Sequence, residues 1–347
     1  MTRQTAIRSF LRRAGWQDAA RGEISGDASF RRYERLCLNG NSAILMDAPP
    51  GKEDVRPFLA IARVLRSWGF AAPNVLGEDI DAGLLLLEDL GDDRFSLVID
   101  RDPDLEAPLY AAAVDLLAAL HDRPAPRELA ISPAKPGAVW RLAPYDAGPL
   151  FAELHLFTDW YLPALRPDSD PETWRQMLDP PWQALIERLD APADVLTLRD
   201  YHADNLMWRP ERAGLGRIGL LDFQDALIGH PAYDLVSLLQ DSRRDIPDAL
   251  EAAMIERYLD GCLERGVRID RGAFLRDYRI LGAQRSAKVI GIFTRLARRD
   301  GKPAYLRHLP RVWRRLEGNL AEGGLSALEG VLDRLVEIRE RRMQPRF

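Results

Sequence analysis

The spacing of hydrophobic positions changes character near residue 90. Before that point, Ser29–Leu38 and Ser42–Asp47 are strand-like runs on either side of Asn39-Gly40-Asn41. An Asn-Gly pair supplies the positive φ angles of a tight turn, so these runs predict a β-hairpin. Apolar residues then recur at helical spacing from Val55 to Leu65, with Gly69 as a stop signal. This pattern predicts a single helix after the hairpin.

A second pair of strand-like runs, Val75–Asp79 and Leu84–Glu88, flanks Asp81-Ala82-Gly83. The run from Leu84 to Leu87 is apolar throughout, which indicates a strand buried on both faces. Residues 1–16 mix arginines with apolar positions and predict an amphipathic helix on the surface. The first 90 residues are therefore expected to form a hairpin, a helix and a second hairpin.

Helical periodicity dominates after Gly91. The pattern predicts helices over Leu105–His121 and Leu150–Leu162 and a series of helices from about Tyr233 to Arg342, with strands only at Val195–Leu198, Leu206–Trp208 and Ile218–Leu221. We expect an α+β fold of two lobes: a β-rich N-terminal lobe (residues 1–90) and a mainly helical C-terminal lobe (residues 91–347). A polar connection near Leu90–Asp93 is the expected hinge, and a ligand is expected at that junction.

Composition excludes several classes of function. The chain has 347 residues and 48 Lys and Arg against 53 Asp and Glu, so its formal charge of −5 disfavours general nucleic-acid binding. Cys37 and Cys262 have no spacing typical of a disulfide framework or a zinc site. No apolar run approaches the roughly 20 residues that span a bilayer. We expect a cytoplasmic monomer with neither a nucleic-acid nor a membrane partner.

Oxygen-bearing side chains gather where two predicted strands end. Asp200 and Asn205 follow the strand that ends at Leu198, and Asp222 follows the strand that ends at Leu221. Phosphoryl transfer needs an oriented hydroxyl group and metal ions that neutralise phosphate charge, and Mg²⁺ prefers carboxylate and amide oxygens. The alternative is structural: Asp200 and Asn205 can form Asx turns, and Asp222 can cap a helix.

The spacing Asp-x-His-x-x-Asn from Asp200 to Asn205, followed by Asp222-Phe223-Gln224-Asp225, resembles the catalytic loop and metal-binding motif of the aminoglycoside phosphotransferase-like kinases. These are relatives of the protein kinases. The resemblance implies a two-lobed protein-kinase-like fold and a reaction that uses ATP and Mg²⁺. It also implies that Asp200 is the catalytic base that orients the acceptor hydroxyl and that Asn205 and Asp222 are Mg²⁺ ligands.

A narrower resemblance is carried by Gly26–Tyr33, Leu45–Pro50 and Asp222–Ala226. These segments are similar to those of the bacterial anomeric kinases of N-acetylmuramate and N-acetylglucosamine, which act in cell-wall recycling. The expected substrate is therefore a small amino sugar, phosphorylated at its anomeric hydroxyl. Two alternatives remain: a kinase of another hydroxyl acceptor, such as an aminoglycoside, choline or homoserine, and a pseudokinase that binds ligands without chemistry.

The same resemblance implies a nucleotide site in the N-terminal lobe. Its expected members are Gly26, Asp27, Ser29, Arg32, Met46, Leu87, Glu88 and Leu90, with the adenine held through backbone groups of the hinge. Protein kinases also carry a lysine on the third strand that grips the phosphates, but Ala43–Asp47 contains none. We hypothesise that Arg31, Arg32 or Lys52 supplies this charge. Side chains alternate along a strand, so only one of the two arginines points toward the nucleotide.

Candidate acceptor-site residues are Asp204, Gln224, Asp225, Arg285 and Lys288. Gln284, Arg285, Lys288 and Arg295 are spaced so that they share roughly one helix face, and an arginine fork suits a substrate carboxylate. The alternative for this face is a solvated basic surface with acidic partners. His202 and Asp234 are expected to support the catalytic loop rather than to react.

Overall fold

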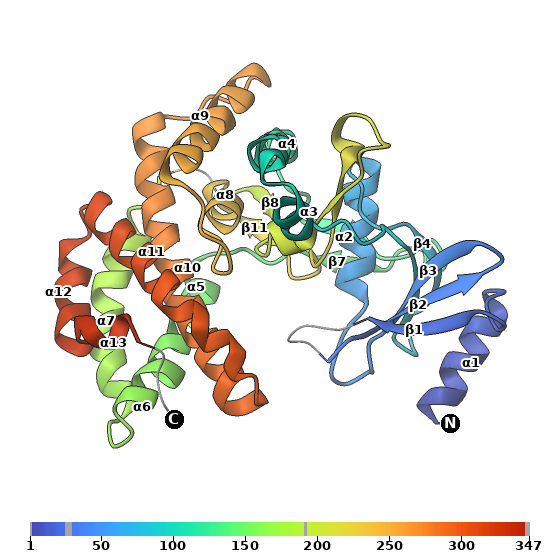
Figure 1. Cartoon of the computed structure of the whole chain (residues 1–347), viewed down its shortest axis with the longest axis horizontal. Coiled ribbons are helices and arrows are strands. Elements are labelled where there is room, and N and C mark those ends of the chain that lie inside the picture. The colour runs from blue at the N-terminus through green and yellow to red at the C-terminus, as the bar shows by residue number, and fades with distance from the viewer. Residues whose placement is uncertain (1, 25–29, 191–192, 344–347) are drawn as a thin grey trace. The chain divides into compact units, whose positions relative to one another are not determined.

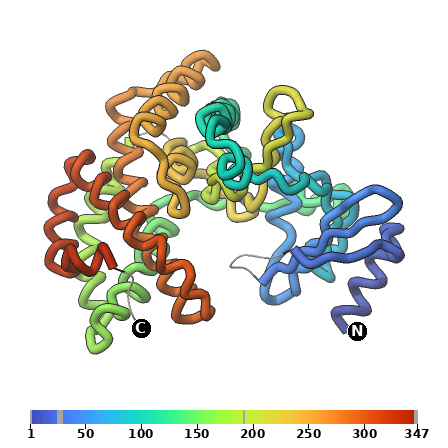
Figure 2. Tube along the Cα trace, viewed as in Figure 1, coloured from blue at the N-terminus to red at the C-terminus, as the bar shows by residue number. Residues whose placement is uncertain are grey.

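The computed structural model describes residues 2–24, 30–190 and 193–343. By their packing the residues form two compact units, traced in Figures 1 and 2. Unit 1 comprises Met1–Ala112, Pro126–Leu142 and Ala203–Ala226, and unit 2 comprises Ala113–Ala125, Ala143–His202 and Leu227–Phe347. Unit 1 contains the main β-sheet and unit 2 is mostly helical, as an α+β fold requires. The lobe boundary at residue 90 stays a prediction.

The sheet of unit 1 has five antiparallel strands in the order β1-β2-β3-β5-β4. Its strands are β1 (Ala20–Ile24), β2 (Arg32–Leu38), β3 (Asn41–Asp47), β4 (Val75–Asp79) and β5 (Leu84–Glu88). Both predicted hairpins are confirmed. Asn39 and Gly40 have φ angles of 50° and 78°, as the Asn-Gly pair predicts. The edge strand β1 was missed because its mostly exposed residues show no hydrophobic alternation.

Helix α1 (Arg3–Arg13) covers part of this sheet with Ile7, Phe10 and Leu11. These side chains pack in one cluster with Leu84 and Leu86 and with residues of β2 and β3. Residues 84–87 of β5 are all buried, so the prediction of a strand covered on both faces is confirmed. The predicted helix after the first hairpin is α2 (Arg56–Ser67), and seven of its residues are buried.

The rest of unit 1 is built from short elements. They are α3 (Phe95–Arg101), η1 (Pro103–Leu105), part of α4 (Glu106–Leu120), β6 (Glu128–Ala130), β7 (Val139–Arg141), η3 (Ala203–Asn205), β9 (Leu206–Trp208), η4 (Gly214–Arg217) and β10 (Ile218–Leu220). Strands β9 and β10 pair antiparallel, so two of the three strands predicted after residue 91 are confirmed here. Strands β6 and β7 were missed because they are three residues long and lie among prolines.

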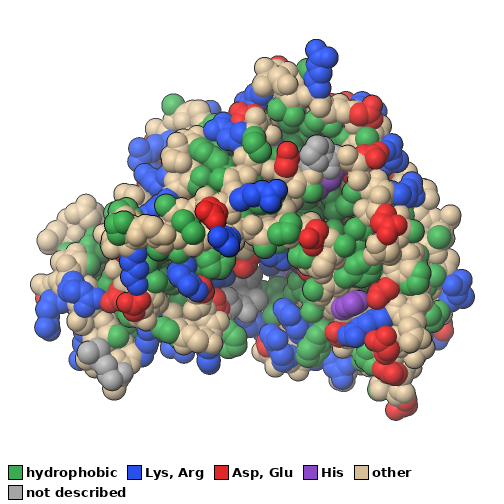
Figure 3. Space-filling view, turned by 180° about the vertical axis from the view of Figure 1, so that it is seen from behind, with side chains coloured by type: hydrophobic (Ala, Val, Ile, Leu, Met, Phe, Trp, Pro, Cys, Tyr) green, Lys and Arg blue, Asp and Glu red, His purple; other side chains and the backbone are tan. Residues whose placement is uncertain are grey.

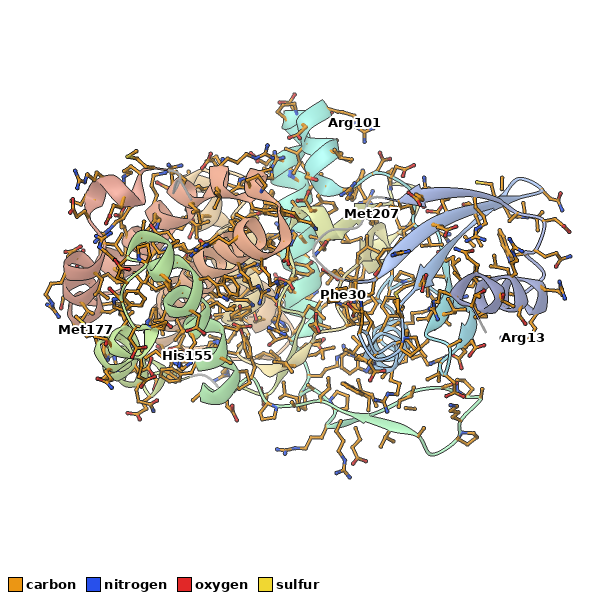
Figure 4. All side chains as sticks on the ribbon, turned by 90° about the horizontal axis from the view of Figure 1, so that it is seen from below. Arg13, Phe30, Arg101, His155, Met177 and Met207 are labelled. Carbon is orange, nitrogen blue, oxygen red and sulfur yellow. The ribbon has the colours of Figure 1, made fainter. Side chains whose placement is uncertain are left out.

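Unit 2 is a helical assembly around the 30-residue helix α10 (Arg271–Asp300). Its other elements are α5 (Ala147–Leu156), the π-helical turn η2 (Phe157–Tyr161), α6 (Leu162–Leu165), α7 (Pro171–Ile186), β8 (Val195–Thr197), β11 (Leu227–Gly229), α8 (Ala232–Leu239), α9 (Asp248–Glu264), η5 (Pro303–His308), α11 (Leu309–Glu322), α12 (Ser326–Leu335) and α13 (Ile338–Arg341). Figure 4 labels His155 on α5 and Met177 on α7. Tyr161 and Trp182 lie in the core of this unit.

Charged side chains of both signs are interspersed on the face shown in Figure 3. That mixture agrees with the nearly balanced composition of the chain. Among the described helices, none combines the length and the apolar character needed to cross a membrane.

Helices α5 and α10 approach closely at Gly291. A Cβ atom placed on Gly291 would lie 2.3 Å from the carbonyl carbon of Leu156. That neighbour is backbone at the end of α5 and cannot rotate away, so only glycine fits there. The close approach brings the polar face of α10 against α5, and this contact carries the charged residues described below.

We therefore expect Gly291→Ala to lower the free energy of unfolding by about 2 kcal/mol or more, because overpacking a core forces the backbone to shift. Gly318→Ala is the matched control. Gly318 lies within α11 and its Cβ would meet nothing within 4 Å, so alanine should raise the free energy of unfolding by up to about 1 kcal/mol through helix propensity. Urea denaturation followed by circular dichroism measures both. Equal effects from the two substitutions would contradict the close helix packing.

Candidate active site

The predicted catalytic loop starts where β8 ends in unit 2. Strand β8 pairs antiparallel with β11, and the chain then turns through Leu198, Arg199 and Asp200. Arg199 has a φ angle of 70°, which is unfavourable for a residue with a long side chain. Such backbone strain persists only where surrounding contacts hold it and is common at functional sites.

Asp234 supplies those contacts to the loop backbone. Its carboxylate oxygens accept the N–H groups of Leu198 and Arg199 at 2.6 and 2.7 Å. Asp234 lies in the first turn of α8 and is fully buried, and burial raises its pKa to about 7 while the two N–H groups act in the opposite direction. This arrangement supports the structural role predicted for Asp234, with loop backbone rather than a side chain as its partner.

The Asp200 carboxylate lies among cations of unit 2. Its side chain is 39% exposed, and Arg285 Nη2 lies 3.9 Å from its Oδ1. Loss of solvent raises the pKa of Asp200, but the positive charges of Lys288 and Arg285 lower it more, and the net pKa is below the ordinary value. Asp200 is therefore ionised at neutral pH, the state that a group accepting a hydroxyl proton requires.

Asn205 and Asp222 lie together in unit 1. The backbone N–H of Leu221 donates to the Asn205 carbonyl at 3.0 Å, which extends the β9–β10 pairing and brings the two segments side by side. Asp222 has a φ angle of 53° and a side chain that is 43% exposed. Gln224 Nε2 donates to its Oδ1 at 2.9 Å. Asp222 is not a helix cap, since no helix begins there.

The donor chemistry of this pair fits Mg²⁺. One carboxylate and one amide oxygen leave positions for phosphate oxygens and water, which is how Mg²⁺ is bound in many phosphoryl-transfer sites. The described residues contain no cluster of three or more His, Cys, Asp or Glu side chains able to hold a metal by themselves. A magnesium ion held by Asn205 and Asp222 would therefore need further ligands, such as phosphate oxygens and water.

The three cations considered for phosphate binding differ in their surroundings. Arg31 Nη2 lies 3.3 Å from Asp222 Oδ1, and its Nε lies 4.0 Å from Glu53 Oε2. Arg32, the next residue, is exposed. Lys52 Nζ lies 4.9 Å from the ring centroid of Phe30, which is labelled in Figure 4. Of these three cations, Arg31 is the one that contacts Asp222, a predicted metal ligand.

Some of the remaining predicted nucleotide-site residues lie within the described part of the chain and others do not. Gly26, Asp27 and Ser29 lie outside the described residues. Met46 on β3 and Leu87 on β5 are buried, and Leu90 is half-buried. Glu88 at the end of β5 pairs with Arg209 at 3.2 Å. Their roles toward the nucleotide stay predictions.

The basic face predicted on one helix is buried. Arg285 and Lys288 on α10 are 7% and 6% exposed, and Gln284 is fully buried, so the expectation of a solvated basic surface is wrong for these residues. The face was misjudged because its counter-charge, Glu153, comes from a distant helix. Lys288 Nζ bonds Glu153 Oε1 at 2.7 Å and the Tyr233 hydroxyl at 3.2 Å.

The other acceptor candidates lie in unit 1. Asp204 on η3 is half-buried, while Asp225 is exposed and its carboxylate accepts from Gln224 Nε2 at 3.2 Å. Gln224 thus bonds both Asp222 and Asp225. Their contacts with a sugar stay predictions.

His202 lies within the predicted catalytic loop and is buried. Its Nε2 lies 3.2 Å from an Arg243 guanidinium nitrogen, and burial lowers its pKa. The ring is therefore neutral near pH 7 and unsuited to act as a cation there. These surroundings fit the supporting role predicted for His202.

Comparison with known proteins agrees with this geometry. The phosphotransferase enzyme family matches residues 22–268. The chain belongs to this family. It is 40% identical to the N-acetylmuramate/N-acetylglucosamine kinase of Caulobacter vibrioides, with 98% of both chains covered. It is 36% identical to the kinase of the same name from Pseudomonas aeruginosa, with 88% of this chain and 86% of the relative covered.

Solved structures of phosphotransferases share the fold. Choline kinase LicA from Streptococcus pneumoniae superposes with a TM-score of 0.62 at 13% identity, covering 92% of this chain and 99% of the other. An aminoglycoside-3′-phosphotransferase of type VIII gives a TM-score of 0.52 at 17% identity, covering 80% of this chain and 97% of the other. The predicted protein-kinase-like fold is confirmed, and the chain is a kinase by family.

Sequence patterns missed the carboxylate that neutralises the cations of this region. Glu153 on α5 is 7% exposed and pairs with both Lys288 and Arg199. Burial alone would raise its pKa, but Lys288 and Arg199 outweigh burial and lower the pKa to about 2. The available signal was a single carboxylate within the otherwise apolar run of residues 147–154, since a buried charge needs a partner.

Because its folded-state pKa is depressed, Glu153 should stabilise the fold above about pH 4.5, and this stability should be lost as the pH falls toward 2. We expect a loss of about 2 kcal/mol between pH 5 and pH 3 from this group. Urea denaturation at several pH values measures it. Glu153→Gln should show a shallower dependence of unfolding free energy on pH over this range, and a slope identical to that of the wild type would refute the assignment.

Proposed function

We propose that this phosphotransferase transfers the γ-phosphoryl group of ATP to the anomeric hydroxyl of N-acetylmuramate or N-acetylglucosamine. The observation that carries the proposal is the ionised Asp200 on a loop anchored by Asp234, in a chain whose relatives of equal length are kinases of these sugars. ATP and the free sugar meet in the cytoplasm, where we place the enzyme as a monomer.

Asp200 is assigned to the acceptor hydroxyl. An ionised carboxylate accepts a hydrogen bond from the hydroxyl group and orients its oxygen toward the phosphorus atom. The rigid anchoring of its loop contributes because positioning supplies much of the rate in phosphoryl transfer. As the bond between the sugar oxygen and the γ-phosphorus forms, the bond from that phosphorus to the β,γ-bridging oxygen breaks and ADP leaves, while Asp200 takes up the hydroxyl proton.

Asn205 and Asp222 are assigned to Mg²⁺. When bound, the ion neutralises phosphate charge. Gln224 holds the Asp222 carboxylate through its amide, which fixes the direction of the oxygen that would coordinate the ion. The contact between Leu221 and Asn205 fixes the spacing of the two segments.

Arg31 is assigned to the nucleotide phosphates in place of the missing lysine. Its side chain is 11% exposed and lies beside Asp222, so its charge is little screened by solvent. The other proposed nucleotide contacts are Gly26, Asp27 and Ser29, the strand residue Met46, and the hinge residues Leu87, Glu88 and Leu90, whereas the exposed Arg32 is not assigned to the nucleotide.

The acceptor site is proposed to involve Asp204, Gln224, Asp225 and Arg285. The guanidinium of Arg285, next to Asp200, suits an acceptor that carries a carboxylate, such as the lactyl group of N-acetylmuramate. A cationic acceptor such as choline would be repelled by the same charge. Lys288 is proposed to act through its buried pair with Glu153.

The test of the activity is an acceptor panel. Protein, Mg·ATP and a set of amino sugars, amino alcohols and aminoglycosides are incubated, and phosphorus NMR locates any new phosphate. We expect a signal on the anomeric oxygen of N-acetylmuramate or N-acetylglucosamine. Phosphate only on an amine-bearing drug would overturn the assignment, and no ADP release with any acceptor would indicate a pseudokinase.

Asp200→Asn tests the role of the base. We expect kcat to fall by about 1,000-fold with little change in ATP affinity, because the lost group acts on the acceptor. Asp179→Asn on α7, where Asp179 pairs with His155, is the control and should leave kcat unchanged. Steady-state kinetics and calorimetric ATP titration measure the two effects. Wild-type turnover by Asp200→Asn would show that the assignment is wrong.

Arg31→Ala and Arg32→Ala form a matched pair of neighbouring substitutions. A charged hydrogen bond contributes about 1.5–3 kcal/mol, so loss of Arg31 should raise the KM for ATP by about 10- to 100-fold. Arg32 is exposed, and its loss should change that KM by less than about 2-fold. The reverse order of effects would assign the phosphate contact to Arg32.

A further inference from the structure

A group of charged and polar side chains from α5, α10, the residues before α5 and the residue before Asp200 gathers around one carboxylate. We call it the Glu153 cluster; its members are Tyr145, Glu153, Arg199, Gln284 and Lys288. Four of these side chains donate to the fifth, the carboxylate of Glu153: Lys288 at 2.7 Å, Gln284 at 3.1 Å, and both Tyr145 and Arg199.

Burying this cluster costs desolvation free energy. Lys288 and Glu153 are 6% and 7% exposed, and taking two charges out of water is repaid only when every polar atom finds good partners. Apolar residues of similar volume often give equal stability at such positions. A buried ion pair is therefore weak evidence for a role in stability. The contacts of this pair indicate a different role.

Arg199 connects the cluster to the reacting group. Its guanidinium pairs with Glu153 and lies 5.3 Å from the ring centroid of Tyr145, while its backbone N–H bonds Asp234. The residue is thus held at both ends in its left-handed conformation, with φ at 70°. Asp200 is the next residue. The backbone conformation of Arg199 therefore affects the direction in which the Asp200 side chain points.

We propose that Glu153 is a positioning residue for phosphoryl transfer, which acts through Arg199 to fix the turn that presents Asp200 to the acceptor hydroxyl. This inference rests on the proposed kinase activity. Glu153 and Arg199 would support that activity without taking part in the reaction themselves. Lys288 neutralises Glu153 and adds positive charge near Asp200, so the same pair orients the base and keeps it ionised.

The test compares two buried carboxylates of unit 2. Glu251 on α9 is 5% exposed and accepts hydrogen bonds from Gln240, Tyr278 and Arg315, all outside the catalytic loop. Glu153→Gln and Glu251→Gln therefore remove the same charge from similar surroundings. Both should lower the melting temperature, but only Glu153→Gln should lower kcat, by about 100-fold, the loss typical of a misplacement near 1 Å.

The KM for ATP should stay within about 2-fold of the wild-type value in both variants, because the affected turn serves the acceptor. Lys288→Met should shift the acid limb of the kcat–pH profile to higher pH, since Lys288 lowers the pKa of Asp200. Tyr145→Phe removes a single donor to Glu153 and serves as a milder variant if Glu153→Gln does not fold; it should lower kcat with unchanged KM for ATP.

Hydrogen exchange provides a readout that does not depend on turnover. In the free protein, the amides of residues 198–202 should exchange faster in Glu153→Gln, or in Tyr145→Phe, than in the wild type, and Glu251→Gln should leave them unchanged. Equal exchange in this segment for all variants would overturn the inference. Equal losses of kcat in Glu153→Gln and Glu251→Gln would do so too.

The experiments distinguish failure of the proposed function from failure of the positioning role of Glu153. If the wild-type protein phosphorylates none of the acceptors, the proposed function is wrong, while the exchange experiment still decides whether Glu153 holds the loop. If the wild type is active and Glu153→Gln is equally active with unchanged exchange, the function stands and the positioning role is refuted.

Discussion

In this phosphotransferase, one buried carboxylate holds the loop that carries the predicted catalytic residue Asp200. Asp234 accepts the N–H groups of two successive residues, Leu198 and Arg199, just before Asp200. An N–H group buried without a partner is costly, and so is a carboxylate buried alone. Each satisfies the other here, which offsets the strained backbone of Arg199 and makes a single conformation of the turn favourable.

The charge arrangement around the loop follows from the packing of α5 and α10. The absence of a side chain at Gly291 permits the approach that brings Lys288 and Gln284 against Glu153. Two of the cations near Asp200, Lys288 and Arg199, pair with the same carboxylate, Glu153 of α5. The proposed catalytic role of Asp200 and the stability of unit 2 thus depend on the same buried contacts, so substitutions here are expected to affect both.

Much of the fold was evident from local patterns. The Asn39-Gly40 turn, the buried run of β5 and the length of α2 depend on interactions between residues close in sequence, and these predictions are confirmed. Strand β1 was missed because an exposed edge strand is stabilised by its hydrogen bonds to β2 and not by buried side chains. The spacing of hydrophobic residues does not predict such backbone pairing.

The sequence by itself determined the family, the segments from Asp200 to Asn205 and around Asp222, and the order of the main elements, because each is encoded in residues a few positions apart. Only the tertiary structure decided that Arg31 rather than Arg32 lies at Asp222 and that Lys288 is buried against Glu153. Those outcomes depend on which segments of the chain pack against each other, and the partners are separated by more than 100 residues. Charge is visible in a sequence, but the counter-charge that neutralises it is defined only once the chain has folded.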